Sequence, residues 1–230
     1  MRRLLLFMCA VFVAVPMAAR AETITIVADR WCPYNCEPGS EHPGVMIEIA
    51  QRAFAKHNIT VEYSVMPWTR AIEETRQHKY TAIVGASHKD APDFVFPGIP
   101  QAQMRNVFYV KKGNEWRFTD MHSLKQVSLG VIADYSYNDQ LNAYIAQNRN
   151  TPIYIQIISG DGALERNVKK LLAGRIGALV EGIHVMDYYL AQHDLVGQIT
   201  QAGSLPASED DNLFIAFSPK EEKAKIYANI

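Results

Sequence analysis

The residue types best suited to binding chemistry lie close together in the segment Pro67-Trp68-Thr69-Arg70, where a helix is expected to begin. A guanidinium pairs bidentately with a carboxylate, and an indole ring offers a large, rigid contact surface. Trp68 and Arg70 are therefore candidates for clamping a small anionic ligand. The competing interpretation is structural, with Trp68 packed in a core and Arg70 in an ion pair.

Ser87 and His88 form a second candidate, because they follow a strand expected at residues 81–84. Loops that leave the ends of parallel strands are common ligand sites in α/β sheets. His88 or Lys89 would supply positive charge, and a histidine would make binding sensitive to pH between about 5 and 8. The competing interpretation for Lys89 is an ordinary solvated side chain.

A third candidate lies at residues 136–138, before another expected helix. The unpaired N–H groups of a first helical turn can bind an anion, so Tyr137 and its neighbours Ser136 and Asn138 are candidate ligand contacts. The competing interpretation is an ordinary helix cap. Asp161 also precedes an expected helix, and that position already favours a capping role over ligand binding.

Two cysteines, Cys32 and Cys36, follow the N-terminal leader. In an oxidising compartment, a pair four residues apart in a loop rich in Pro and Asn favours a small disulfide loop. Zinc would need more ligands, and His42 is the only imidazole nearby in the sequence. We therefore expect a disulfide, and neither a metal nor a cofactor.

Catalytic motifs are missing from the sequence. It has no G-x-S-x-G elbow, no H-E-x-x-H pair and no P-loop, and its seven histidines are scattered. No cysteine is left as a nucleophile once Cys32 and Cys36 are paired. These features favour a binding protein over an enzyme.

The first 21 residues have the pattern of a secretory signal peptide. Arg2 and Arg3 form its positive region, residues 4–15 its apolar region, and an A-x-A motif ends at Ala21. Cleavage there predicts a soluble periplasmic protein. The remaining chain holds 20 basic and 24 acidic residues, and this mildly acidic balance argues against a nucleic-acid partner.

Short β-rich segments alternate with helical patterns along the rest of the chain, which is typical of parallel sheets flanked by helices. We expect strands at residues 23–28, 59–65, 81–84, 127–132, 153–158, 176–180 and 213–217. We expect helices at residues 45–54, 70–78, 138–147 and 162–173. The pattern predicts a first lobe formed by residues 22–110 and 205–230, and a second formed by residues 111–204.

The end of the chain predicts one further helix. Ser218-Pro219-Lys220-Glu221 combines an N-cap, a proline at the first helical position and a capping-box glutamate. The apolar pattern that follows runs to Ile230 without a stop signal, so we expect this helix to continue in a longer chain.

Five segments, in their order and spacing, resemble the periplasmic solute-binding proteins of family 3, the polar amino acid-binding proteins of ABC transporters. The segments are Trp31-Cys32-Pro33-Tyr34 followed by Gly44, Pro67-Trp68-Thr69-Arg70-Ala71, Gly85-Ala86-Ser87 leading to Phe96-Pro97, Gly130-Val131 followed by Tyr135-Ser136-Tyr137, and Leu171-Leu172-Ala173-Gly174-Arg175-Ile176. The resemblance covers residues 22–230. It implies the α/β, two-lobed periplasmic-binding-protein fold of type II, with a two-strand hinge and a ligand cleft that closes between the lobes.

The resemblance also bears on the ligand. It implies that Tyr34 faces the ligand, although packing is the competing role. Members that bind amino acids usually carry an arginine after the strand matching residues 81–84, where this chain reads Ser87-His88-Lys89-Asp90-Ala91. They also usually carry an aspartate where this chain has Gly182, and Glu181 is a candidate substitute. The expected ligand is a small polar solute, an amino acid or a related carboxylate.

The function implied by the resemblance is capture of that solute by a monomeric protein outside the cytoplasm, for the permease of an ABC transporter. Two alternatives stay open at this point. A protein of the same fold can signal ligand binding to a membrane receptor. Some proteins of this fold also resemble dehydratases that act on cyclic acids, and in that case Glu181 and His88 would serve as acid or base groups.

Overall fold

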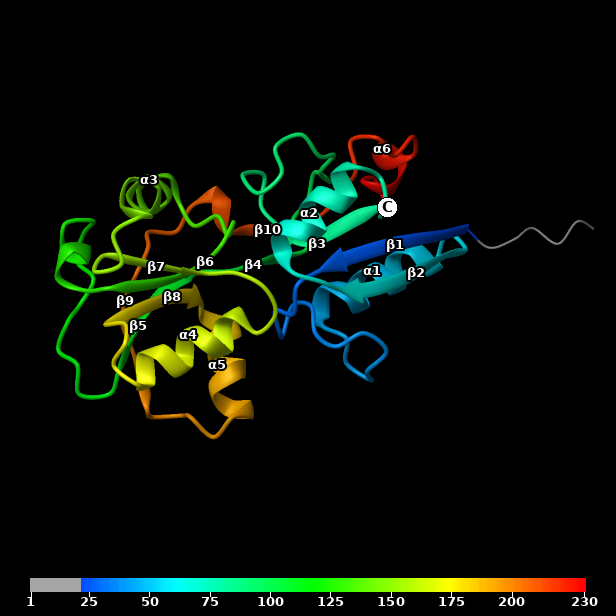
Figure 1. Ribbon diagram of the computed structural model, residues 1–230. Coiled ribbons are helices and arrows are strands. Elements are labelled where there is room, and N and C mark those ends of the chain that lie inside the picture. Colours follow the sequence, from blue (N-terminus) through cyan, green and yellow to red (C-terminus); the bar gives the residue numbers. More distant parts are fainter. Residues whose placement is uncertain (1–21) are drawn as a thin grey trace, which may run out of the picture.

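The structure is a computed structural model that describes residues 22–230, and these form two lobes, each built on a five-stranded mixed sheet (Figure 1). The expected signal peptide, residues 1–21, lies outside the described residues. Within residues 22–230, no helix is both long and apolar enough to cross a membrane.

The first lobe has the strand order β2-β1-β3-β10-β4. Its strands are β1 (Glu22–Ala28), β2 (Ile59–Val65), β3 (Ala82–Ala86), β4 (Ala102–Gln103) and β10 (Asn212–Phe217), and its helices are α1 (Val45–Ala55), α2 (Trp68–Arg76) and α6 (Ala224–Tyr227). β1 is parallel to β2 and β3, whereas β10 is antiparallel to β3 and β4. The carboxyl ends of β1 and β3 therefore meet at one edge of the sheet, and that edge faces the other lobe.

The second lobe has the strand order β7-β6-β8-β5-β9. Its strands are β5 (Asn106–Lys111), β6 (Leu129–Ile132), β7 (Ile155–Ile158), β8 (Ala178–Gly182) and β9 (Ile199–Ser204), and its helices are α3 (Asp139–Asn148), α4 (Ala163–Leu172) and α5 (Ile183–Gln192). Two 3₁₀ turns, Ser123–Gln126 and Glu209–Asp211, complete the fold. β6 is parallel to β7 and β8, so these strands also end at a common edge.

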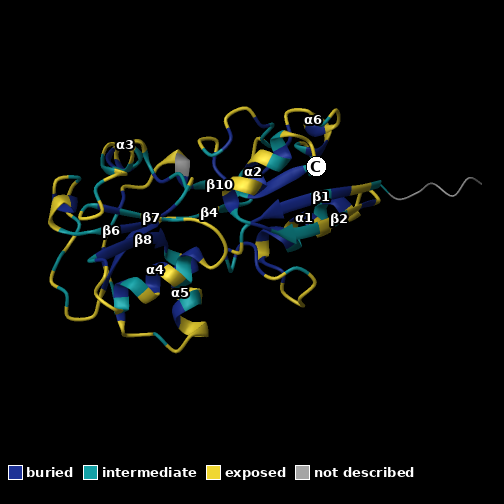
Figure 2. Ribbon diagram, in the orientation of Figure 1, coloured by how far each residue is buried: buried dark blue, intermediate teal, exposed yellow. Residues whose placement is uncertain are grey.

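Strand alternation divides the core of the second lobe between the two faces of its sheet, and the central strand β8 is buried along its length (Figure 2). Along β5, Phe108 and Val110 pack in the cluster that includes α3, whereas Val107 and Tyr109 pack with α4 and α5. Successive side chains of a strand point to opposite faces, so a central strand covered on both sides must be apolar throughout. The same argument applies to β8, whose five residues are all buried.

The first crossing between the lobes differs from the expected boundary. The sequence analysis placed residues 22–110 in the first lobe, but β5 pairs with β8 and β9 in the second sheet. The chain therefore leaves the first sheet after Gln103 and enters the second at Asn106. The continuous apolar run of β5 suits either sheet, so its pattern alone could not assign the strand to a lobe.

The helix expected to begin at Ser218 is also wrong, because residues 218–223 form turns and only Ala224–Tyr227 is α-helical. The Ser218 N–H donates to the Thr81 carbonyl as an extension of sheet pairing, 2.9 Å away. It is therefore not available to Glu221, as a capping box requires. Glu221 Oε2 instead lies 2.9 Å from Nε2 of His78.

Candidate ligand-binding cleft

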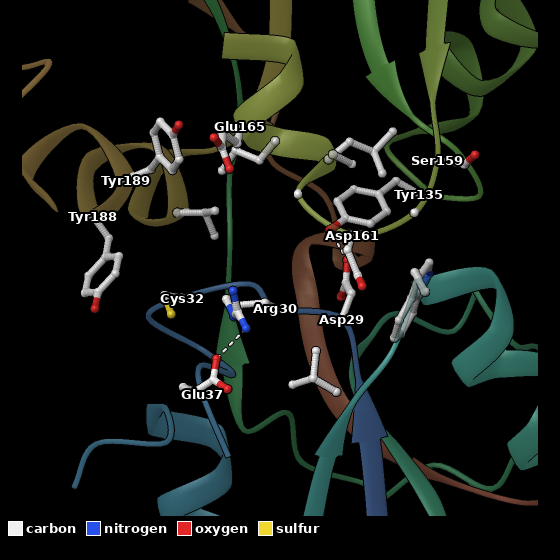
Figure 3. A pocket seen from close by; sticks show the side chains of 18 of the residues that line it. Asp29, Arg30, Cys32, Glu37, Tyr135, Ser159, Asp161, Glu165, Tyr188 and Tyr189 are labelled. Atoms are coloured by element: carbon white, nitrogen blue, oxygen red, sulfur yellow. Dashed lines mark hydrogen bonds and ion pairs between the residues drawn. The ribbon is translucent and has the colours of Figure 1, made fainter. Parts of the chain in front are cut away.

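The cleft between the lobes lies where the parallel strands of both sheets end. Asp29 follows β1 and Ser87 follows β3, while Glu181 lies near the end of β8 and Tyr135 three residues beyond β6. This is the edge at which α/β sheets commonly bind ligands. A cavity of about 620 Å³ opens there between the lobes, and Figure 3 shows Asp29, Asp161 and Tyr135 at its centre.

The cleft has a wide part and a narrow part, which share Asp29, Trp68 and Tyr135. The wide part is rich in polar and aromatic groups, among them Arg30, Tyr63, Ser159, Asp161, Glu165, Tyr188, Tyr189 and His193. The narrow part has a volume of about 30 Å³ and is lined also by Trp31, Ser87, Asp90, Met104 and Ser136. A space of 30 Å³ holds about one water molecule, so a solute must occupy the wide part or separate the lobes.

Side chains cross the cleft and hold the lobes together. Trp31 Nε1 of the first lobe donates to Glu181 Oε1 of the second over 3.0 Å. In the opposite direction the Tyr135 hydroxyl donates to Asp29 Oδ2.

Two further contacts join the lobes. Thr69 Oγ1 donates to Asp134, and Lys89 Nζ lies 2.5 Å from Asp139 Oδ1. The lobes are thus already in contact around a largely filled narrow part.

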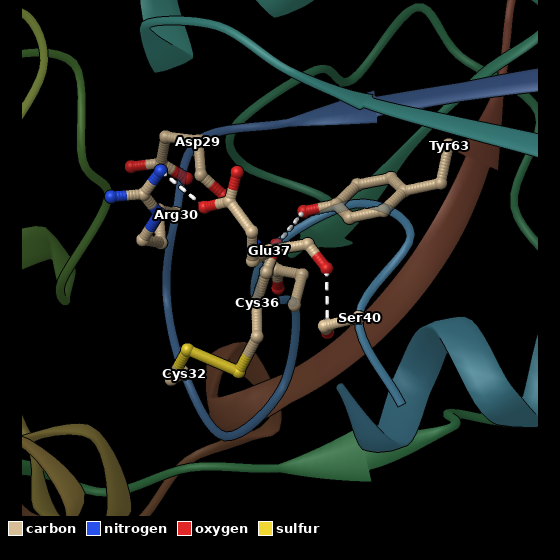
Figure 4. The surroundings of a disulfide bond; sticks show 8 residues. Asp29, Arg30, Cys32, Cys36, Glu37, Ser40 and Tyr63 are labelled. Carbon is tan, nitrogen blue, oxygen red and sulfur yellow. Dashed lines mark hydrogen bonds and ion pairs between the residues drawn. A yellow bond between two sulfur atoms is a disulfide. The ribbon is translucent and has the colours of Figure 1, made fainter. Parts of the chain in front are cut away.

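The loop that presents Trp31 is held by a disulfide between Cys32 and Cys36, as the sequence predicted (Figure 4). The Trp31 N–H donates to the Asn35 carbonyl over 2.8 Å, which closes the loop around the disulfide. Gly44 packs directly against this loop. Its φ is +115°, and a Cβ there would lie 2.4 Å from the Tyr34 carbonyl oxygen, so only glycine allows this approach.

The Trp31 ring packs against residues of both lobes at the cleft. It stacks on Tyr34 with 4.8 Å between ring centroids, and the edge of Tyr135 meets it at 6.3 Å. A Cβ at Gly182 would lie 3.3 Å from Trp31 Cζ2. Even a methyl group at residue 182 would be in tight contact with the indole, so the packing of Trp31 favours glycine there.

Three carboxyl groups at the cleft have raised pKa values. Burial raises the pKa of Asp29 to about 6, although the Tyr135 hydrogen bond opposes the shift. Burial likewise raises the pKa of Asp90 to about 6, although hydrogen bonds from Ser87 oppose the shift. Burial also raises the pKa of Glu181 to about 7, although the hydrogen bond from Trp31 opposes it. Desolvation disfavours a charge that no nearby cation compensates.

Tyr135 keeps its proton throughout the physiological range, because burial and the charges of Asp29 and Glu181 raise its pKa well above the usual value. Its hydroxyl therefore acts as a donor to Asp29. Since Tyr135 comes from the second lobe and Asp29 from the first, the pair joins the lobes at the point where the wide and narrow parts of the cleft meet.

Three of the site residues proposed from the sequence lie at the cleft. Trp68 is 7% exposed and lines both parts. Ser87 lines the narrow part, where its N–H and its hydroxyl both donate to Asp90 Oδ2 over 2.7 Å. Glu181 is 2% exposed and accepts from Trp31.

Tyr34, a fourth proposed residue, stacks on Trp31, and its hydroxyl donates to the Gln103 carbonyl over 2.7 Å.

The other three proposed residues do not line the cleft. Arg70 lies on the outer face of α2, where Nε is 2.7 Å from Glu74 Oε1. His88 is exposed and stacks on Phe96 with 4.2 Å between ring centroids. Tyr137 is buried in the core of the second lobe, where its hydroxyl accepts from the Ile132 N–H.

The two expected helix caps have different outcomes. The Asn138 side chain accepts from the Leu141 N–H over 2.8 Å, so an ordinary cap occupies the start of α3. The capping role assigned to Asp161 is wrong, because Gly162 occupies the N-cap position of α4 and no side chain caps that helix. Gly162 has φ +65°, which turns the chain so that Asp161 lines the cleft instead.

Four residues important to the cleft were missed or undervalued: Asp29, Trp31, Asp90 and Tyr135. A signal was present for the two acids, since Asp29 directly follows the first strand and Asp90 lies in the loop after the third. Trp31 and Tyr135 stand within segments that carry the family resemblance. Their contacts across the cleft depend on how the lobes meet, which no local pattern encodes.

The acids at the cleft do not form a metal centre. Within residues 22–230, no group of three His, Cys, Asp or Glu side chains is placed to hold a metal ion. The arrangement instead offers carboxylates, hydroxyls and aromatic faces, which recognise a small molecule through hydrogen bonds, charge and stacking.

Comparison with known proteins places the fold. No protein-family model and no curated protein matches the sequence. A solved structure of an ancestral arginine-binding protein bound to arginine matches with TM-score 0.71 and 17% identity, over 91% of this chain and 90% of that one. A histidine kinase sensor domain with similarity to periplasmic binding proteins matches with TM-score 0.71 and 15% identity, over 91% and 87%.

A third match is a structure from work on glutathione import via GshT and the cystine ABC importer TcyBC of Streptococcus mutans, with TM-score 0.74 and 16% identity over 91% of this chain and 87% of that one. These similarities extend over nearly all of the described chain and include both sheets. The protein therefore has the α/β, two-lobed fold of the periplasmic binding proteins.

Proposed function

We propose that the protein captures a small polar solute between its lobes, outside the cytoplasm, and presents the closed form to a membrane partner. The observation that carries this proposal is the cavity of about 620 Å³, which both lobes line and which contains buried polar groups. Only the connections from β4 to β5 and from β9 to β10 join the two sheets. Such a geometry suits hinge closure around a ligand.

The favoured partner is the permease of an ABC transporter. The support is the fold shared with an arginine-binding protein and with the structure connected to the cystine importer. Binding rather than catalysis is favoured because the acids at the cleft are engaged by Trp31, Tyr135 and Ser87 in contacts that fix the lobes and the loops.

The test is native mass spectrometry of the exported protein, purified without denaturation, followed by small-angle scattering before and after the retained solute is removed by dialysis. We expect one solute per chain and a larger radius of gyration once it is removed. A chain that retains nothing, and that keeps one radius under every condition with a panel of amino acids, amines, carboxylates and sugars, would refute the proposal.

A sensory role is the second candidate, because a histidine kinase sensor domain shares the fold with TM-score 0.71. Both roles use the same closure of the lobes and differ in the membrane partner. Crosslinking of the ligand-saturated protein in its native envelope distinguishes them: capture of a permease subunit supports transport, and capture of a receptor kinase supports sensing.

A further inference from the structure

The narrow part of the cleft holds acidic side chains without basic ones. Its lining includes Asp29 and Asp90, and no Lys, Arg or His is among the residues that line it. Asp90 is held by Ser87 through a backbone N–H and a hydroxyl, which are neutral donors. Asp29 is held by the hydroxyl of Tyr135. Neutral donors orient these carboxylates and leave their charge uncompensated.

Two basic side chains, Arg30 and His193, line the wide part of the cleft, and neither of them lines the narrow part. The His193 ring packs against Tyr189, with 4.2 Å between ring centroids. The Arg30 guanidinium forms an ion pair with Glu37, as Figures 3 and 4 show. Asp161 also lines the wide part and lies close enough to Asp29 to raise the pKa of that group. The acidic character of the narrow part therefore extends into the larger cavity.

A second, independent observation is the unsatisfied carboxylate of Glu181. This residue is 2% exposed, and its Oε1 accepts from both Trp31 Nε1 and the Gly182 N–H. Its Oε2 is buried and has no hydrogen-bond partner within the described chain. An unpartnered, buried carboxylate oxygen is costly unless a donor or a cation reaches it.

Aromatic faces surround the same region. Trp68 and Tyr135 line both parts of the cleft, and Trp31 lines the narrow part. Tyr188 and Tyr189 of α5 lie at the side of the wide part, as Figure 3 shows. Indole and phenol faces attract cations through the negative potential above the ring, and this attraction is strongest where water is excluded.

We propose that the solute is an organic cation, a protonated amine, whose ammonium group enters the narrow part between Asp29 and Asp90, against the ring of Trp68, while the rest of the solute lies in the wide part. This inference rests on the proposed function and specifies its ligand class. An anionic solute would meet several carboxylates and no available basic group in the narrow part.

Titratable groups face Asp29 from several elements, and their signs agree with this ligand class. The groups that interact with it are Tyr63 of β2, Asp90 of the loop after β3, Tyr135 of the loop after β6, Asp161 before α4 and Glu181 of β8. All five become negative on losing a proton. The basic group of this region, Arg30, interacts with Tyr63 and is paired with Glu37. Each added negative charge raises the affinity for a cation, so binding strengthens as the three carboxyl groups ionise.

The test is isothermal titration of the exported protein at pH 7.5, after dialysis, with three sets of probes. The cations are 1,4-diaminobutane, tetramethylammonium and L-lysine, the anions are glutarate and L-glutamate, and the neutral solutes are L-glutamine and glucose. We expect at least one cation to bind with one-to-one stoichiometry, and to bind at least tenfold more tightly than any anion.

Two further measurements assign that binding to the cleft. Asp29→Asn keeps an acceptor for Tyr135 and removes the charge, so it should lower the affinity for the cation at least tenfold. The control is Glu222→Gln, an exposed change before α6, which should leave that affinity within twofold of the unmodified protein. Every cationic probe keeps its positive charge from pH 5 to 7.5. The affinity of whichever cation binds should therefore rise at least tenfold over this range in the unmodified protein, even if Asp29→Asn fails to fold.

The possible failures are distinguishable. Binding of only anionic or neutral solutes would overturn the cationic ligand class and leave the proposed function standing. Equal affinities for Asp29→Asn and the unmodified protein, or a cation affinity that does not change with pH, would place the cation elsewhere on the molecule. Absence of binding to every probe, together with no retained solute, would overturn both proposals.

Discussion

Acidic side chains on the outer face of the first lobe and those in the cleft differ in what accompanies them. On the outer face, Arg70 lies 2.7 Å from Glu74, and Arg76 contacts both Asp93 and Glu73. Hydrogen bonds from these arginines lower the pKa values of Glu74 and Asp93, and hydrogen bonds from Gln77 and then Arg76 lower that of Glu73. In the cleft, the acids meet hydroxyl, indole and amide donors, and burial raises their pKa values.

The difference lies in whether a positive side chain of the same chain pairs with the acid. Exposed ion pairs contribute little to stability, because water already solvates both partners. Buried carboxylates without a cation destabilise the ligand-free fold, and they persist where the surrounding structure holds them for binding. The acids at the surface of α2 are paired with arginines, whereas those of the cleft meet only neutral donors.

Among changes to the cleft, removing Trp31 should cause the largest loss in the free energy of unfolding. Trp31→Ala deletes a buried ring and one of the donors to Glu181, so we expect the free energy of unfolding to fall by about 3 to 5 kcal/mol. Urea denaturation measures this loss. Trp31→Phe keeps most of the packing and removes only the donor, so its loss should be smaller. Equal losses would show that packing contributes nothing beyond the hydrogen bond.

The pH dependence of stability should be the next largest effect. The pKa values of Asp29 and Asp90 rise from 3.8 to about 6 in the folded chain, and that of Glu181 rises from 4.5 to about 7. The folded state then binds more protons than the unfolded state, so the stabilisation present below pH 4 is lost as pH rises through 6 to 7. We expect each of the three groups to contribute a loss of about 1 to 2 kcal/mol between pH 5 and 7.5 in the ligand-free protein.

Urea denaturation at several pH values, with and without bound solute, tests this prediction. A cationic solute favours the ionised carboxylates, so saturation should remove or reverse the decline. The double variant Asp29→Asn/Glu181→Gln should show a flatter profile without solute. Stability that rises steadily from pH 5 to 7.5 in the ligand-free protein would contradict the electrostatic account of the cleft.

Loss of the disulfide should have an intermediate effect. Closing so short a loop stabilises a fold by about 2 kcal/mol in the chain-entropy estimate, so Cys32→Ser/Cys36→Ser should lower the free energy of unfolding by about that amount. Solute affinity should also fall, because Trp31 and Tyr34 are carried by this loop. A reducing agent should destabilise the unmodified protein and leave the double variant unchanged.

The smallest effect should come from the outer face. Arg70 has a side chain that is 65% exposed and an ion pair with Glu74 one helical turn away. We expect Arg70→Ala to change the melting temperature by less than about 2 °C and solute affinity by less than twofold. A large loss of affinity would return Arg70 to the ligand site that the sequence first suggested for it.

The sequence predicted the architecture better than the site. Periodic patterns placed β2 at residues 59–65 and α3 within one residue, because hydrophobic spacing reports directly on burial. The predicted lobe boundary at β5 and the predicted helix at Ser218 were wrong. Both depend on which neighbouring strand pairs with the backbone. Local patterns carry no information about that choice.

The site residues illustrate the same limit. Trp68, Ser87 and Glu181 could be proposed because each lies where a strand ends or a helix starts near the cleft. Arg70 has suitable chemistry but points along the outside of its helix, toward Glu74. Asp29 follows the first strand, but its place in the site depends on the hydrogen bond from Tyr135, 106 residues away. Contacts between lobes decide which of the polar residues form the site.

A crystal structure of the protein with its most tightly bound solute tests the central claim most directly. The account predicts that the solute lies between the lobes, with a positively charged nitrogen within about 4 Å of the carboxylate of Asp29 or Asp90, close to the ring of Trp68. A solute bound outside the cleft, or one that turns a carboxylate toward these acids, would contradict it.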